Sequence, residues 1–142
     1  MGKSLGAFLH ELAARLPCDL VRVEKAVSPA DFEVTAILQH LENERKFPAL
    51  LFEKPLNLKG EPSSFPLLSN VFATRSRCAL ALGMDREDER LALSLEYARR
   101  EEKLVPPAVI PTRDAPVKKV IKRGEEADLY EMPIVRHHAM DP

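Results

Sequence analysis

Apolar residues recur at steps of three and four near the start of the chain, and this spacing predicts an amphipathic helix over residues 4–16. The stripe consists of Leu5, Phe8, Leu9, Leu12 and Leu16. Ser4 is placed to cap the start of this helix, and Pro17 stops it. We expect the stripe to be buried within the domain rather than to face a partner protein.

Residues 19–27 alternate between apolar and polar positions, which predicts a half-buried strand. A second helix is predicted to begin at Ser28, with Pro29 at its first helical position, and to continue to about residue 45. Its charged end, residues 42–46, is interpreted as a solvated face rather than as a pair of active carboxylates.

The most apolar part of the chain follows in residues 48–53 and 67–72, which predict two buried strands. The first is apolar on both faces, as a central strand requires. A polar loop, residues 54–64, separates them. Asn70 interrupts the second strand, and a buried amide must be hydrogen-bonded. We expect Asn70 to fix a loop or a strand end, with a ligand contact as the alternative.

A third helix is predicted between Thr74 as its N-cap and Gly83 as its C-cap. Arg75 and Arg77 lie in its first turn, where basic charge opposes the helix dipole. One interpretation is a surface salt bridge; the other is that they bind an anion or a carboxylate of a neighbouring domain. The surface salt bridge is favoured.

A fourth, strongly charged helix is predicted over residues 84–103, with a thin apolar stripe formed by Leu91, Leu95 and Ala98 or Tyr97. Acidic residues are expected at a helix start for stability, so we do not interpret the cluster there as a metal site; it consists of Asp85, Glu87, Asp88 and Glu89. Residues 104–116 carry four prolines and predict an extended surface connector.

Residues 117–123 predict a short strand that ends at Gly124. Its four basic residues resemble a nucleic-acid contact, but acids follow at once and no aromatic platform accompanies them, so a solvated strand face is favoured. Residues 127–135 predict a turn and then the start of a strand. His137 and His138 are adjacent and point to opposite faces of a strand, which argues against a metal site formed by this pair.

Length and composition restrict the fold class and the kinds of site that the sequence can form. A chain of 142 residues with 45% apolar and 30% charged residues fits one soluble domain. The predicted fold class is α+β (α/β): a small mixed sheet of four to five short strands with three to four helices packed on it. Cys18 and Cys78 form no Cys-x-x-Cys pair and are interpreted as small buried hydrophobes. Glycine-rich phosphate-binding loops are absent from the sequence.

The net charge of −1 argues against binding to nucleic acid or to an anionic membrane. No apolar run approaches the roughly 20 residues that a membrane helix needs. The N-terminus shows no signal-peptide block, and we therefore expect a cytoplasmic location.

Three stretches of this sequence resemble the N-terminal region of the UbiD family of decarboxylases. They are residues 47–53 (FPALLFE), residues 66–83 (PLLSNVFATRSRCALALG) and residues 128–134 (DLYEMPI). The order of the predicted elements also fits, so the resemblance spans essentially the whole chain. It is specific for the family and indicates nothing about the substrate.

The resemblance implies a full-length enzyme that removes or adds carboxyl groups on aromatic, heteroaromatic or α,β-unsaturated acids. Such enzymes use prenylated flavin mononucleotide (FMN) with a divalent metal such as manganese (Mn2+) and a potassium ion (K+). Full-length members are homo-oligomeric, with a flavin-binding domain and a dimerisation domain after the N-terminal domain. Their catalytic residues and metal ligands come after Pro142, so the resemblance assigns no catalytic, cofactor-binding or metal-binding residue here, and no chemistry to Asn70, Arg75 or Arg77.

We therefore expect residues 1–116 to be the N-terminal α/β domain, and residues 117–142 to start the flavin-binding domain or a connecting segment, truncated at Pro142. Alone, the chain is expected to be inactive and to hold no cofactor. The expected partner is the rest of the subunit. The alternative is a non-catalytic accessory subunit that docks onto a separate flavin-bearing chain. An apolar surface is expected to be exposed near residues 104–140, with self-association or loose packing of the C-terminal end.

Overall fold

The computed structural model describes residues 4–84 and 91–141. Its centre is a three-stranded mixed sheet in the order β1-β2-β3. β1 (Leu20–Val23) pairs in parallel with β2 (Ala49–Phe52), and β2 pairs antiparallel with β3 (Leu67–Ser69). The parallel pair is joined by a crossover through α2 (Glu33–Asn43), because parallel strands cannot be joined by a tight hairpin.

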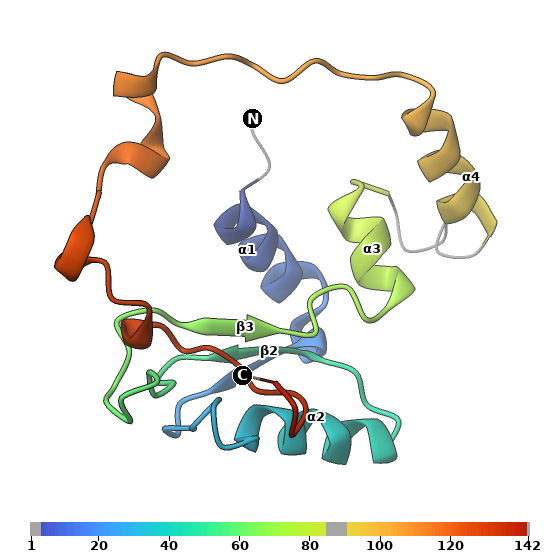
Figure 1. Ribbon diagram of the computed structural model, residues 1–142. Coiled ribbons are helices and arrows are strands. Elements are labelled where there is room, and N and C mark those ends of the chain that lie inside the picture. Colours follow the sequence, from blue (N-terminus) through green and yellow to red (C-terminus); the bar gives the residue numbers. More distant parts are fainter. Residues whose placement is uncertain (1–3, 85–90, 142) are drawn as a thin grey trace.

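Helices cover both faces of this sheet (Figure 1). On one face, α2 packs through Val34 against Leu50 and Phe52 of β2. On the other, Leu12 of α1 (Leu5–Arg15) and Leu80 of α3 (Arg75–Ala81) enclose Ala49. Successive residues of β2 thus point into different cores, and this confirms the prediction of a central strand that is buried on both faces.

Several helix ends follow the predicted local signals. Ser4 caps α1, accepting a hydrogen bond from the backbone N–H of Ala7. Thr74 caps α3 in the same way through the N–H of Arg77. Gly83 follows α3 with a φ of 67°, and the N–H groups of Gly83 and Met84 bond to the carbonyls of Leu80 and Ala79. This pattern is a Schellman motif, which favours glycine at that position.

The predicted start of the second helix is wrong by four residues: the N-cap is Phe32 instead of Ser28, and the first helical residue is Glu33 instead of Pro29. Ser28 does not cap a helix; its hydroxyl donates to Asp31, and its N–H donates to the carboxylate of Glu33. These bonds close a turn that ends at Phe32 in the left-handed region, with a φ of 64°. The helix therefore begins only at Glu33, because local side-chain bonds compete with the helical ones.

Strands are fewer and shorter than predicted. Residues 19–27 contribute only the four residues of β1, with Val27 in an isolated bridge to Pro55. β3 ends at Ser69 because Asn70 adopts a φ of 60°. Residues 117–123 and 132–135 form no strand. The chain instead makes four short 3-10 turns, η3 (Thr112–Asp114), η4 (Pro116–Lys118), η5 (Gly124–Glu126) and η6 (Leu129–Glu131). The α+β class is confirmed, with three strands and four α-helices in the described residues.

After α4 (Leu91–Glu101) the chain leaves the body of the domain as a long arc. We call residues 104–127 the strap. Its exposed apolar side chains agree with the expected apolar surface; the most exposed are Leu104, Val105, Val109, Val117 and Val120. Among the described residues, no backbone group between Leu104 and Ile110 is hydrogen-bonded. The expected extended connector is therefore present over residues 104–111.

Residues 128–141, which we call the clasp, return to the α2 side of the domain. The N–H of Arg136 donates to the carbonyl of Pro29, and the Thr35 hydroxyl donates to the carbonyl of Arg136. The Arg136 guanidinium lies 5.1 Å from the centre of the Phe32 ring. The C-terminal end is thus attached to the domain, and the loose packing expected there applies to the strap. No helix in the described residues has both the length and the apolar character to cross a membrane.

Candidate functional site

Arg77 is the third residue of α3, two positions after Arg75, and its side chain is fully buried. Its guanidinium donates to Asp19 at 3.0 Å and to the carbonyls of Val71 at 2.8 Å and Asn70 at 3.0 Å. A further bond goes to the carbonyl of Phe47. Arginine suits this position because its planar group carries five donors in a fixed fork. The side chain thereby joins η1 (Pro17–Asp19), the approach to β2 and the turn after β3.

Asn70 contributes from the neighbouring turn. It ends β3 in the left-handed conformation, which asparagine tolerates better than most residues. Its side-chain amide donates to the carbonyl of Pro48 at 2.9 Å, and its own carbonyl accepts from Arg77. This confirms the prediction that Asn70 fixes a strand end, and the amide is engaged by the protein itself.

The two arginines of α3 have different surroundings. The favoured surface salt bridge is wrong for Arg77, because its side chain is fully buried and its ion pair with Asp19 lies inside a network of backbone carbonyls. An external anion cannot reach it either. Arg75 is exposed and donates to the hydroxyl of Ser94 in α4 at 3.2 Å, which links the two helices.

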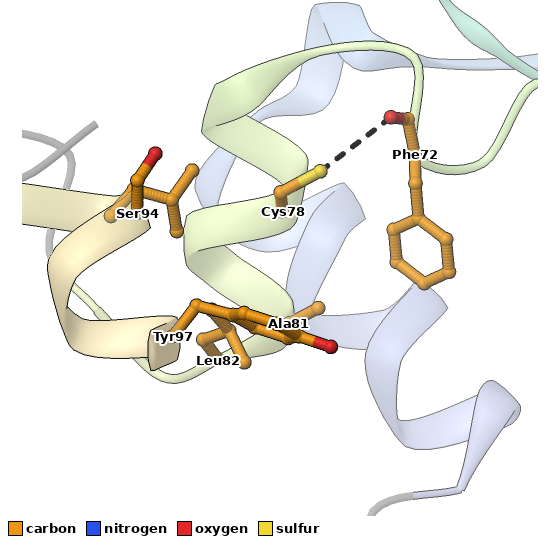
Figure 2. A pocket seen from close by; sticks show the side chains of 7 residues that line it. Phe72, Cys78, Ala81, Leu82, Ser94 and Tyr97 are labelled. Atoms are coloured by element: carbon orange, nitrogen blue, oxygen red, sulfur yellow. Dashed lines mark hydrogen bonds between the residues drawn. The ribbon is translucent and has the colours of Figure 1, made fainter. Parts of the chain in front are cut away.

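An apolar pocket of 410 Å³ opens between α3 and α4 (Figure 2). Its lining is formed by Phe72, Cys78, Ala81, Leu82, Leu93, Ser94 and Tyr97. The volume is within the range of about 300–1,000 Å³ that is typical of small-molecule pockets. A bond from Arg100 of α4 to the carbonyl of Leu82, at 2.6 Å, helps to hold the two walls together.

The polar groups in this pocket are already engaged. The Cys78 thiol faces the carbonyl of Phe72 at 3.5 Å, as Figure 2 shows, and the Ser94 hydroxyl accepts from Arg75. A hydrogen bond to Glu101 raises the pKa of Tyr97, so its phenol is less acidic than usual. None of the lining residues is basic. The pocket therefore suits an uncharged apolar group, and its lining residues include no cation that could pair with a carboxylate.

Sequence reasoning missed this pocket because it misplaced the apolar stripe of α4. Leu93 is buried, whereas the predicted Leu95 is 61% exposed and Tyr97 is 52% exposed. Leu93 and Tyr97, four residues apart, face the pocket. That spacing was the signal available in the sequence.

His137 and His138, which the sequence places on a strand, instead lie at a turn near the end of the clasp. The carboxylate of Asp141 accepts the backbone N–H groups of His137 at 2.7 Å and His138 at 2.8 Å. These bonds hold the pKa of Asp141 below its ordinary value. The ring of His137 lies 3.2 Å from the hydroxyl of Thr35. These contacts attach the clasp to α2.

Within residues 4–84 and 91–141, no group of three or more His, Cys, Asp or Glu side chains is placed to hold a metal ion. The acidic cluster Asp85, Glu87, Asp88 and Glu89 lies outside the described residues. Cys18 is exposed, so its interpretation as a buried hydrophobe is wrong, and Cys78 is partly buried at the pocket. Cys18 follows Pro17 in η1, outside the alternating pattern, which explains the error.

One comparison with known proteins bears on these features. A family model described as the 3-octaprenyl-4-hydroxybenzoate carboxy-lyase N-terminal domain matches residues 17–94. The matched range begins at η1, includes all three strands and α3, and ends in α4. It contains Arg77 and each partner of its guanidinium, so the network is part of what the family model spans.

Proposed function

This chain belongs to the UbiD family, and from that premise we propose that it is the N-terminal domain of a carboxy-lyase. The reaction of the complete enzyme is the reversible, non-oxidative decarboxylation of an aromatic, heteroaromatic or α,β-unsaturated carboxylic acid. It takes place in the cytoplasm. The chain itself acts as a scaffold and is inactive alone.

The observation that carries this proposal is the role in the fold of residues 66–83, one of the stretches that resemble the family and here called the family signature. Asn70 and Arg77 are among its polar residues, and both bind backbone carbonyls of this domain. A guanidinium that is fully buried cannot contact a substrate. The signature therefore supports a structural role for the domain within a larger enzyme.

The cofactor set that the family implies is prenylated FMN with Mn2+ and K+. The described residues do not fit this group. They offer no cluster of metal ligands, and the pocket between α3 and α4 has no basic side chain for a flavin phosphate. The glycines with positive φ, Gly60, Gly83 and Gly124, lie far apart in sequence and form no phosphate-binding loop. We therefore propose that other parts of the subunit hold the cofactor.

We further propose that residues 1–116 form the N-terminal domain and that residues 117–142 start the flavin-binding domain or a connecting segment. The strap, which spans residue 116, is exposed on both sides of it, as a segment between two domains is, and this supports a domain boundary within the strap. The clasp then attaches the connecting segment to α2 through Arg136.

The test compares this chain with a polypeptide in which the flavin and dimerisation domains of a UbiD-type enzyme follow it. Each is purified, incubated with prenylated FMN, Mn2+ and K+, and assayed for CO2 release from a panel of unsaturated acids. The fused polypeptide is expected to retain flavin and release CO2, and the chain alone to do neither. Stoichiometric flavin with turnover by the chain alone contradicts the proposal.

The second candidate is an accessory subunit that docks onto a separate flavin-bearing chain. The exposed apolar side chains of the strap favour it, because such surfaces mark interaction sites. Co-expression with a separately encoded flavin-bearing UbiD chain, followed by purification through a tag on this chain, distinguishes the two. A stoichiometric complex with turnover supports the accessory role.

A further inference from the structure

The clasp contacts the domain at two places, near its two ends. At the first, the Lys59 ammonium pairs with the carboxylate of Asp128 at 2.7 Å. The N–H of Leu58 donates to the carbonyl of Tyr130 at 3.0 Å. The loop after β2 therefore offers the clasp one cation and one backbone donor.

At the second place, the clasp is held through one apolar side chain and one arginine. Val135 packs against the core cluster that α2 and β2 enclose. The N–H of Arg136 donates to the carbonyl of Pro29 at 3.1 Å, and the carbonyl of Arg136 accepts from the Thr35 hydroxyl at 3.1 Å. Main-chain bonds beside a buried apolar side chain are the means by which protein surfaces bind peptides, because the bonds give affinity and the side chain gives specificity.

The turn before α2 has a backbone conformation that suits a binding site. Phe32 has a φ of 64°, in a region that bulky residues avoid. Its ring lies under the Arg136 guanidinium, 5.1 Å from the ring centre, and a cation over an aromatic face is attracted to it. Strained backbone is concentrated where proteins bind ligands. The turn therefore presents the Phe32 ring to Arg136 at a conformational cost.

The strap takes no part in this attachment. Among the described residues, no backbone group between Leu104 and Ile110 is hydrogen-bonded, and the apolar side chains there are exposed. Such a linker raises the local concentration of the clasp but adds no contact. The attachment itself is moderate, because the Nε of Arg136 is buried and donates to no acceptor in the described part of the chain. It can therefore be made and broken.

We propose that the clasp is a latch: residues 128–141 bind the surface formed by residues 29–35 and 58–59 as a ligand that stays bound after the strap is cut. The class of ligand is a peptide in which an apolar residue directly precedes an arginine and an acid lies upstream, as Val135, Arg136 and Asp128 are arranged. In the intact chain the clasp occupies the surface and competes with other peptides of this class. The latch is independent of the proposed catalytic role, because it depends on binding alone.

The first measurement cuts the strap within the complete chain. The recognition sequence of a site-specific protease replaces residues 104–110, which make no backbone hydrogen bonds. After cleavage, the fragment with residues 111–142 is expected to stay bound to the rest of the domain in size-exclusion chromatography from about 10 to 500 µM, a range that covers weak to moderate affinities. Circular dichroism is expected to stay unchanged. Separation of the fragment throughout this range, or unfolding on cleavage, overturns the proposal.

The second measurement identifies the contact by its dissociation constant in the cut protein. Arg136→Ala is expected to raise this constant by roughly tenfold or more. Arg123→Ala removes an exposed arginine of the same fragment and is expected to leave it unchanged. Phe32→Gly retains the turn, because glycine adopts a positive φ without strain, and is also expected to weaken binding. Equal effects of the two arginine variants, or undiminished binding by Phe32→Gly, overturn the proposal.

The third measurement tests exchange with a dye-labelled peptide of residues 128–141. The peptide is expected to displace the fragment from the cut protein. It is expected to bind the uncut chain roughly tenfold more weakly or less, because the tethered clasp competes at a high effective concentration. The same peptide with Arg136→Ala is the control and is expected to displace nothing. Equal binding to the cut and uncut chains overturns the proposal, because it places the peptide on another surface.

Discussion

Arg77 connects three segments of the domain that are distant in sequence. Its partners Asp19, Phe47 and Asn70 lie 58, 30 and 7 residues away. It supplies donors to three backbone carbonyls as well as to Asp19, and an acceptor that loses its donor inside a protein costs about 1–3 kcal/mol. The side chain therefore satisfies the ends of several elements at once, which explains a charged residue in an otherwise apolar interior.

Replacing Arg77 by Ala removes this network and leaves Asp19 with an unpaired charge. We expect the free energy of unfolding to fall by roughly 3–5 kcal/mol, the range for breaking one partner of a buried pair. Urea denaturation followed by circular dichroism measures the loss. If the Ala variant does not fold, Asp19→Asn gives the milder step: a loss of about 1 kcal/mol, because a neutral acceptor remains.

Arg75→Ala serves as the control, since Arg75 belongs to the same helical turn but is exposed. Its expected loss is within about 1 kcal/mol, as for surface interactions generally. Equal losses for Arg75→Ala and Arg77→Ala are incompatible with the network described above.

Glu96 provides a pH-dependent contact on α4. Hydrogen bonds from Arg99 and Arg100 lower its pKa from the ordinary 4.5 to about 2. Since the folded-state pKa lies below the unfolded one, this contribution to stability is complete above pH 4.5 and is lost as the pH falls towards 2. An NMR titration of the Glu96 carboxyl group is expected to show the low midpoint. Glu96→Gln is expected to flatten the dependence of helicity on pH between those values, and an unchanged profile contradicts this assignment.

Replacing glycine by alanine is expected to change the stability of the protein in opposite directions at two helix positions, Gly6 and Gly83. An added Cβ meets no atom within 4 Å at either Gly6 or Gly83, so packing does not decide the outcome. Gly83 has a φ of 67°, and Ala there is expected to destabilise the protein by about 1 kcal/mol. Gly6 lies in α1, where Ala is expected to stabilise by about 0.5–1 kcal/mol. Thermal unfolding of both variants measures the sign, and destabilisation by Gly6→Ala would contradict it.

The elements that the sequence predicts well are those whose cause is local. The stripe of α1, apart from Leu5, which is exposed and not buried as expected, depends on neighbours within a few residues, and so do the Thr74 and Gly83 caps and the apolar run of β2. The burial of Arg77 could not be predicted in this way, because it depends on Asp19 and on carbonyls from two other segments. The strand predicted over residues 117–123 failed for a related reason: a strand needs a paired neighbour, and the described sheet offers it none.

For the whole molecule, the main contrast is between the strap and the clasp. The strap has exposed side chains and no hydrogen bonds between Leu104 and Ile110, whereas the clasp is bonded to the loop after β2 and to α2. Lys59 pairs with Asp128 at 2.7 Å, and the N–H of Leu58 donates to the carbonyl of Tyr130. The two segments are adjacent in sequence, but only the clasp gains stability from contacts with the domain.

This contrast predicts the pattern of amide hydrogen exchange. At concentrations of a few micromolar, well below those expected to favour weak association, residues 104–110 are expected to exchange at the rate of an unfolded peptide. The amides of Leu58 and Arg136 are expected to be protected at least tenfold, because both donate to backbone carbonyls across the clasp contact. Thr35→Val removes the hydroxyl that donates to Arg136 and is expected to reduce the protection of Arg136. It is expected to leave the protection of Leu58 unchanged, because the Leu58 bond lies at the other end of the clasp.

Equal exchange of strap and clasp, measured by NMR or mass spectrometry, would show that residues 128–141 are not attached to the domain. Protection of the strap that appears only as the concentration rises would instead be the signature of association through it.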